Sequence, residues 1–170
     1  YQGDFLLITG PNGGGKTSLL RTILRLQSPT KGQITFFRQG EPVSSLDMGY
    51  LPQKNSIDSR FPITVEEVVA SGLMGNTQKG NTKFDSKKEI DEMLDLMGIT
   101  ALRNKPIGVS SGGQLQRSLF GRALISKPEM LILDEPASYI DRQFGNRMFE
   151  ILRDLSSNGT TIMMVSHEIE

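Results

Sequence analysis

Short apolar runs alternate along this chain with segments whose apolar residues recur every three or four positions. A run of four or five apolar residues is typical of a buried strand, and the longer spacing is typical of a helix packed on one face. Strands that alternate with helices favour an α/β fold built on a parallel sheet. The runs expected to form strands cover residues 5–8, 33–38, 48–51, 130–133 and 161–165.

Three helix starts are indicated by local polar signals, and a fourth by the spacing of its apolar residues. A serine or threonine followed three residues later by Glu or Gln forms a capping box, in which the two residues satisfy each other's free backbone N–H groups. Such boxes begin at Thr64, Ser86 and Ser111, and a fourth helix begins at Lys16. Because few strands lie among the helices between 64 and 125, we expect an inserted helical sub-domain over about 60–125. The flanking segments 1–53 and 126–170 then form a catalytic core within one domain.

One glycine-rich stretch carries the most specific chemistry. Residues 10–17 read G-P-N-G-G-G-K-T, the G-x-x-x-x-G-K-T pattern of a phosphate-binding loop, and they lie between an apolar run and a helical pattern. Glycines allow backbone N–H groups to surround phosphates, while Lys16 reaches the β- and γ-phosphates and Thr17 binds Mg²⁺. The expected nucleotide-contacting residues are Gly10, Pro11, Asn12, Gly13, Gly14, Gly15, Lys16, Thr17 and Ser18.

Polar residues follow two of the predicted strands. Asp134 and Glu135 come directly after the run 130–133, and His167, the one histidine of the sequence, follows the run 161–165. Ligands of open α/β sheets bind at the carboxyl ends of the strands. We therefore expect Asp134 to be a second anchor for Mg²⁺, Glu135 to polarise an attacking water, and His167 to contact the γ-phosphate.

Composition narrows the remaining possibilities. The 170 residues carry 19 Lys and Arg and 19 Asp and Glu, so no net basic charge points to nucleic acid. The sequence holds no cysteine and no apolar run of membrane-spanning length. A cytosolic protein is expected, with any membrane role exerted through a partner.

Together these motifs strongly resemble those of the ATP-binding cassette (ABC) ATPases. The stretch 10–17 resembles the Walker A loop, and 131–135 resembles Walker B with its catalytic glutamate. Gln53 is similar to the Q-loop glutamine and His167 to the switch histidine. The segment 137–141 is similar to the D-loop, although Tyr139 and Ile140 replace its usual Ala-Leu. The most specific match is the signature, which corresponds to Ser111, Gly112, Gly113 and Gln114 followed by Gln116 and Arg117.

The resemblance implies a fold and a composite site. The fold is α/β, a P-loop NTPase (RecA-like) core with a parallel sheet, an inserted helical sub-domain and a partial antiparallel β sub-domain. ATP and Mg²⁺ are the implied cofactors, with Thr17, Gln53 and Asp134 at the metal and Glu135, Gln53 and His167 in catalysis. Two copies pair head to tail, so that Ser111 to Gln114 of one copy, together with Asp141, complete the nucleotide site of the other. The family also extends beyond both ends of this chain, so the resemblance implies that residues 1–170 are part of a longer domain.

The stretch 60–69, which follows Gln53, is similar to the corresponding region of importer ATPases for zinc, manganese and iron chelates. It implies an ATPase subunit that powers a membrane transporter, lies peripherally on the cytoplasmic face of the membrane and contacts transmembrane permease subunits. The alternative is a soluble ABC ATPase acting on DNA or ribosomes, although the interval between Gln53 and Ser111 shows no sustained heptads. A non-hydrolysing ATP-binding module is a third reading, and Glu135 and His167 argue against it.

Overall fold

The computed structural model describes residues 2–53, 61–74, 83–138 and 140–166, with the backbone alone at 83–85. Its main sheet has four strands in the order β1-β6-β5-β4, and all of its pairs are parallel. A second, antiparallel pair joins β2 to β3. The strands are β1 (Phe5–Ile8), β2 (Phe36–Arg38), β3 (Glu41–Val43), β4 (Met48–Leu51), β5 (Met130–Asp134) and β6 (Thr161–Val165).

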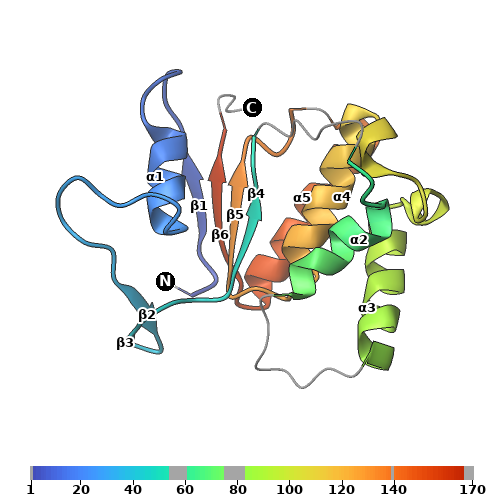
Figure 1. Ribbon diagram of the computed structural model, residues 1–170. Helices are drawn as coiled ribbons and strands as arrows, with labels where there is room; N and C mark the ends of the chain where they lie inside the picture. Colours follow the sequence, from blue (N-terminus) through green and yellow to red (C-terminus); the bar gives the residue numbers. More distant parts are fainter. Residues whose placement is uncertain (1, 54–60, 75–82, 139, 167–170) are drawn as a thin grey trace.

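Helices cover both faces of this sheet (Figure 1). The first helix lies on one face, and the remaining α-helices lie on the other. The α-helices are α1 (Lys16–Ile23), α2 (Val65–Ala70), α3 (Lys83–Leu96), α4 (Gly112–Leu124) and α5 (Arg142–Ser157), with short 3-10 helices η1 (Ser71–Leu73), η2 (Thr100–Leu102) and η3 (Ile107–Val109). The predicted α/β architecture with a parallel sheet and a small antiparallel pair is thereby confirmed. The division into core and helical sub-domain stays a prediction.

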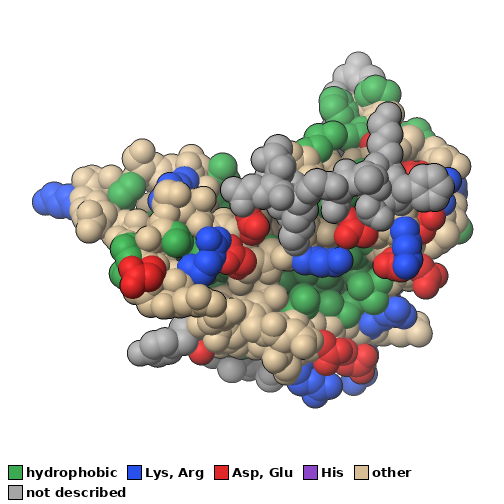
Figure 2. Space-filling model, turned by 90° about the horizontal axis from the view of Figure 1, so that it is seen from below, with side chains coloured by type: hydrophobic (Ala, Val, Ile, Leu, Met, Phe, Trp, Pro, Cys, Tyr) green, Lys and Arg blue, Asp and Glu red, His purple; other side chains and the backbone are tan. Residues whose placement is uncertain are grey.

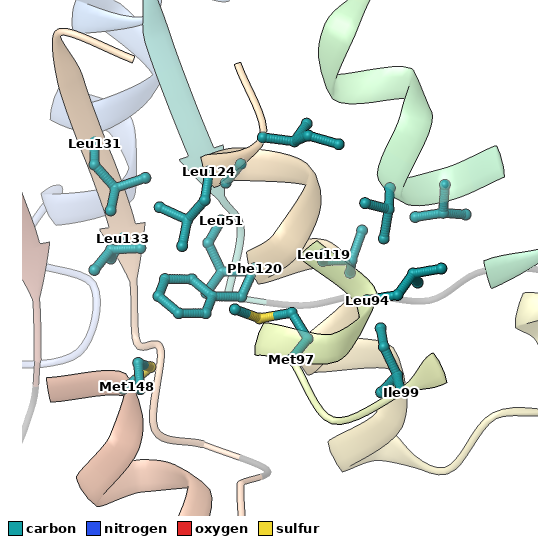
Figure 3. Close-up of a cluster of buried hydrophobic side chains, with 14 of the residues drawn as sticks. Leu51, Leu94, Met97, Ile99, Leu119, Phe120, Leu124, Leu131, Leu133 and Met148 are labelled. Atoms are coloured by element: carbon teal, nitrogen blue, oxygen red, sulfur yellow. The ribbon is translucent and has the colours of Figure 1, made fainter. Parts of the chain in front are cut away.

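The alternation of side chains along β5 builds two cores. Met130 and Ile132 face α1, whereas Leu131 and Leu133 face the helices on the other side. Figure 3 shows the larger core, in which Phe120 lies near Leu133 of β5, Met148 of α5 and Met97, which directly follows α3. Every residue of β5 is buried, as expected of a central parallel strand. The strand therefore holds its carboxyl end, Asp134, in a fixed place.

Two expectations about these elements were wrong. The run 5–8 forms a strand, but Phe5, Leu6 and Leu7 are 42%, 43% and 45% exposed, because β1 pairs only with β6 and lies at the edge of the described sheet. Ser86 does not cap a helix, because α3 already begins at Lys83 and no residue between 83 and 86 is a helix breaker. The capping boxes at Thr64 and Ser111 are confirmed.

The lower end of the molecule, away from the carboxyl ends of the strands, is shown in Figure 2. Acidic and basic side chains lie next to one another across this face. An ion pair joins Arg38 of β2 to Glu129, which directly precedes β5, at 2.5 Å. The antiparallel hairpin is thus attached to the central strand by an ion pair.

Candidate functional site

The loop between β1 and α1 exposes its backbone. Gly13 and Gly15 adopt φ angles of 78° and 82°, in the left-handed region that favours glycine. A Cβ atom at either position would meet nothing within 4 Å, so the space in front of this backbone is open. Gly15 is the N-cap of α1 and provides no side-chain hydrogen bond to it. The first N–H groups of α1 therefore have no side-chain cap, which is the arrangement that binds a phosphate at a helix N-terminus.

Lys16, the first residue of α1, folds back over this loop. Its ammonium group donates to the carbonyl oxygens of Gly10 at 2.7 Å and Pro11 at 2.9 Å. The positive charge thus lies within the mouth of the loop. A phosphate group that entered the loop would find both backbone N–H groups and this ammonium group.

Asp134 lies opposite the loop, at the carboxyl end of β5. Its carboxylate is 1% exposed, and its Oδ2 accepts a hydrogen bond from the Thr17 hydroxyl at 3.0 Å. Its Oδ1 is buried and has no hydrogen-bond partner among the described residues. A buried carboxylate oxygen needs a partner, and Mg²⁺ prefers carboxylate and hydroxyl oxygens. The donor set of Thr17 and Asp134 therefore fits a magnesium ion.

Glu135 follows in a backbone conformation that is unusual for its type. Its φ is 53°, in the left-handed region, and its N–H donates to Val165 of β6 at 2.9 Å. Its Oε2 accepts from the Ser138 hydroxyl at 3.4 Å. Non-glycine residues keep such a conformation only where the surroundings impose it, and such positions cluster at functional sites.

These groups converge on one cavity of about 210 Å³. It brings together three segments that are distant in sequence: the glycine loop with the start of α1, the end of β4, and the end of β5. Parallel strands place their carboxyl ends at the same edge of a sheet, which explains the convergence. The lining residues are Asn12, Gly13, Gly14, Gly15, Lys16, Thr17, Ser18, Gln53, Asp134 and Glu135.

The structure does not bring every predicted site residue to this cavity. Ser111 and Gln114 form a reciprocal capping box at the exposed N-terminus of α4, with bonds of 3.0 and 3.3 Å. Neither these residues nor Gly112 and Gly113 line the cavity. His167 lies outside the described residues.

Asp141 has partners within its own chain. It caps α5 by accepting from the Phe144 N–H at 3.0 Å, and it forms an ion pair with Arg117 of α4. The backbone N–H of Phe144 first, and Arg117 second, lower the pKa of the Asp141 carboxyl. Arg117 also stacks over the Phe144 ring, with 4.3 Å between the guanidinium carbon and the ring centre. The sequence did not indicate this cluster, and the role of Asp141 toward a nucleotide stays a prediction.

Known proteins resemble this chain in sequence and in fold. The family model described as ABC transporter matches residues 1–138. The chain belongs to the ABC transporter family. It is an ATP-binding ATPase of that family, as its motifs predicted. Among the described residues, none of the helices is both long and apolar enough to span a membrane.

Individual relatives agree with the family model. A Chlamydia pneumoniae protein named probable metal transport system ATP-binding protein is 42% identical, over 99% of this chain and 70% of its own length. The zinc uptake system ATP-binding protein ZurA of Listeria monocytogenes is 38% identical, over 99% of this chain and 67% of its own. The dimeric post-hydrolysis structure of the cassette MJ0796 bound to ADP and Pi superposes with a TM-score of 0.82 at 26% identity, covering 99% of this ABC chain and 76% of that chain.

Proposed function

We propose that this ABC ATPase binds ATP with Mg²⁺ in the cavity between the glycine loop and Asp134. The observation that carries the proposal is the buried Oδ1 of Asp134, which lies next to Thr17 and has no hydrogen-bond partner among the described residues. When bound, the metal ion would neutralise the charge that develops on the phosphates. The Lys16 ammonium group would exchange the carbonyl oxygens of Gly10 and Pro11 for phosphate oxygens.

Glu135 is the proposed general base. It lines the same cavity as Lys16 and Thr17, one residue beyond the carboxylate assigned to the metal. It can accept a proton from a water molecule aligned on the γ-phosphate, which a carboxylate committed to a metal ion cannot do. Gln53, two residues beyond the end of β4, lines the same cavity and is proposed to contact the metal ion or the water.

A second copy of the chain is the proposed source of the remaining groups. The exposed capping box at Ser111 provides a helix N-terminus suited to an anion, yet it does not line the cavity of its own chain. Head-to-tail pairing would bring this N-terminus to the nucleotide of the partner. The dimeric structure of the cassette that superposes on this chain supports pairing of two copies.

The proposed cellular role is to power import of a metal ion or metal chelate from the cytoplasmic face of the membrane. Its support is the names of the relatives, which refer to metal transport and zinc uptake. Permease subunits would contact the surface that includes Phe61, which is 54% exposed. Arg60, which precedes it, lies outside the described residues. With the cognate permease in vesicles, Phe61→Ala should reduce uptake of zinc more than it reduces ATP hydrolysis, and equal losses would count against this docking surface.

Glu135→Gln tests the reaction in the full-length protein. The substitution keeps the shape of the side chain but removes its basicity, so ATP binding should persist while hydrolysis slows by about 10²- to 10⁴-fold. The matched control is Glu129→Gln, the same change at the other end of β5, which should leave hydrolysis unchanged. Gel filtration with ATP should show a dimer of the Glu135→Gln protein, and mostly monomer without nucleotide. A wild-type rate in this variant would remove Glu135 as the base.

A further inference from the structure

One polar side chain of α4 is buried on the apolar face of that helix. Gln116 is 1% exposed and lies in helical phase with Leu119, Phe120 and Ala123, all of which are buried. A buried amide is tolerated where its hydrogen bonds are made. The amide nitrogen of Gln116 donates across to another element, reaching the carbonyl oxygen of Pro136 at 3.1 Å.

The peptide that Gln116 holds belongs to the catalytic segment. Pro136 directly follows Glu135, whose left-handed φ of 53° must be imposed by its neighbours. On one side the Glu135 N–H is fixed to Val165 of β6 at 2.9 Å. On the other side Gln116 donates to the carbonyl oxygen of the next residue, Pro136. The two hydrogen bonds bracket the backbone of Glu135 between β6 and α4.

A second link from α4 reaches the same segment. Arg117, the next residue, pairs with Asp141, which caps α5. Both ends of the segment 136–141 are therefore attached to one turn of α4. The N-terminus of that helix, one turn earlier, carries the capping box of Ser111 and Gln114.

We propose that Gln116 is a positioning residue for Glu135. Through its hydrogen bond to the Pro136 carbonyl, Gln116 holds the Glu135 carboxylate where it can accept a proton from the attacking water. The inference rests on the proposed function of Glu135 as the base. It assigns to a residue of α4, the helix that begins with the signature motif, a role in the nucleotide site of its own chain. Because Gln116 does not line the cavity that is proposed to hold the nucleotide, its loss should affect the rate of the chemical step and leave nucleotide affinity unchanged.

The test is a kinetic comparison in the full-length protein. Gln116→Met keeps the length of the side chain and removes its hydrogen-bonding groups. It should lower kcat by about 10- to 100-fold, the effect of a slightly misplaced catalytic group, while KM and the dissociation constant of ATP stay within about twofold. The matched control is Ser118→Ala, which removes another buried polar group of α4 whose hydrogen bond stays within the helix, to the Gln114 carbonyl at 2.8 Å. This control should keep the wild-type kcat.

A double-mutant cycle separates positioning from a merely structural role. In the Glu135→Gln background, Gln116→Met should cause no further loss of kcat, because the carboxylate that Gln116 positions has already been replaced by an amide that cannot act as a base. An equal loss in both backgrounds, an unchanged kcat, or a loss of ATP affinity matching the loss of kcat would each overturn the inference. If Glu135→Gln itself hydrolyses ATP at the wild-type rate, the proposed function fails. If Glu135→Gln is slow but Gln116→Met hydrolyses ATP at the wild-type rate, the proposed role of Glu135 as the base stands and the positioning role of Gln116 fails.

Discussion

The two faces of the main sheet differ in how much core they bury. On the face covered by α2 to α5, twenty-one described side chains form one buried cluster, whereas the face covered by α1 buries six. The nucleotide loop belongs to the second face, beside a strand with three half-exposed apolar residues. The helical face thus supplies stability and fixes Asp134 and Glu135 in place, and the α1 face leaves backbone open for a ligand. We therefore expect substitutions on the helical face to lower the stability of the fold and substitutions on the α1 face to weaken nucleotide binding.

The largest effect on stability is expected on the helical face. Phe120 is fully buried and meets the Phe144 ring edge-on, with 6.5 Å between the ring centres (Figure 3 shows its neighbours). Phe120→Ala should lower the free energy of unfolding by about 3–5 kcal/mol, because transfer and cavity terms add. Chemical denaturation would measure it. The control is Phe37→Ala on the hairpin, where the ring is 60% exposed. Similar losses in the two variants would contradict the assignment of the main core.

The next effect belongs to the α1 face and depends on nucleotide. At 100 times its dissociation constant, a ligand stabilises the folded state by about 2.7 kcal/mol. Lys16→Ala should lose most of this stabilisation, because the ammonium group at the mouth of the loop is removed, while stability without nucleotide changes little.

Thermal unfolding with and without ATP and Mg²⁺ would measure the loss. Lys31→Ala provides the control, since Lys31 is an exposed lysine beyond the end of α1. A wild-type shift in the Lys16 variant would remove Lys16 from the site.

The contrast between the faces also explains what the sequence could predict. Local signals found the elements that depend on neighbours in the chain: the buried run of β5, and the caps at Thr64 and Ser111. The edge position of β1 was missed, because the number of neighbouring strands is not encoded in four apolar residues. Strand β3 was missed because it contains Pro42, which a two-stranded ladder tolerates at its edge. The turn before it, at Gln39 and Gly40 with φ angles of 53° and 85°, carried a weak hairpin signal.

The site residues likewise divide into those that local motifs predicted and those whose contacts only the structure revealed. The glycine loop, Asp134, Glu135 and Gln53 were predicted by motif and meet at one cavity. The contacts of Gln116 with Pro136 and of Arg117 with Asp141 join residues 20 and 24 positions apart, and no local pattern encodes them. One signal was present: a glutamine in phase with the apolar face of α4 must find a buried partner.

Two equivalent helix caps allow a sharper test at an intermediate magnitude. Thr64 and Ser111 form the same capping box, one on the packed α2 and the other at the exposed start of α4. Replacing either with Ala should cost about 1 kcal/mol of unfolding free energy. Ser111→Ala should in addition reduce ATP hydrolysis, whereas Thr64→Ala should not. Denaturation and a steady-state assay on both variants would decide, and equal activity would leave Ser111 as a cap alone.

The smallest effect concerns how the hairpin is attached to β5. Arg38 donates two hydrogen bonds to the Glu129 carboxylate, at 2.6 and 2.5 Å, and the Asp47 N–H donates a third at 3.0 Å. The hydrogen bond from Arg38 is the main cause that lowers the pKa of Glu129. A carboxyl whose pKa is lower in the folded state stabilises the protein above its unfolded pKa of about 4.3 and loses that contribution as the pH falls through the folded value.

Glu129→Gln should therefore lower the free energy of unfolding at pH 7 by less than the loss of a cap, because both partners are partly exposed. The difference from the wild type should shrink as the pH falls below about 4.3, where the carboxylate is protonated. Denaturation at a series of pH values would measure it. Arg38→Gln provides the matched control, since it removes the main cause of the pKa shift and should flatten the same pH dependence. The difference between Glu129→Gln and the wild type could instead stay constant at low pH. That result would show that the Glu129 side chain stabilises the hairpin by packing and not by its charge, so the hairpin would not be attached electrostatically.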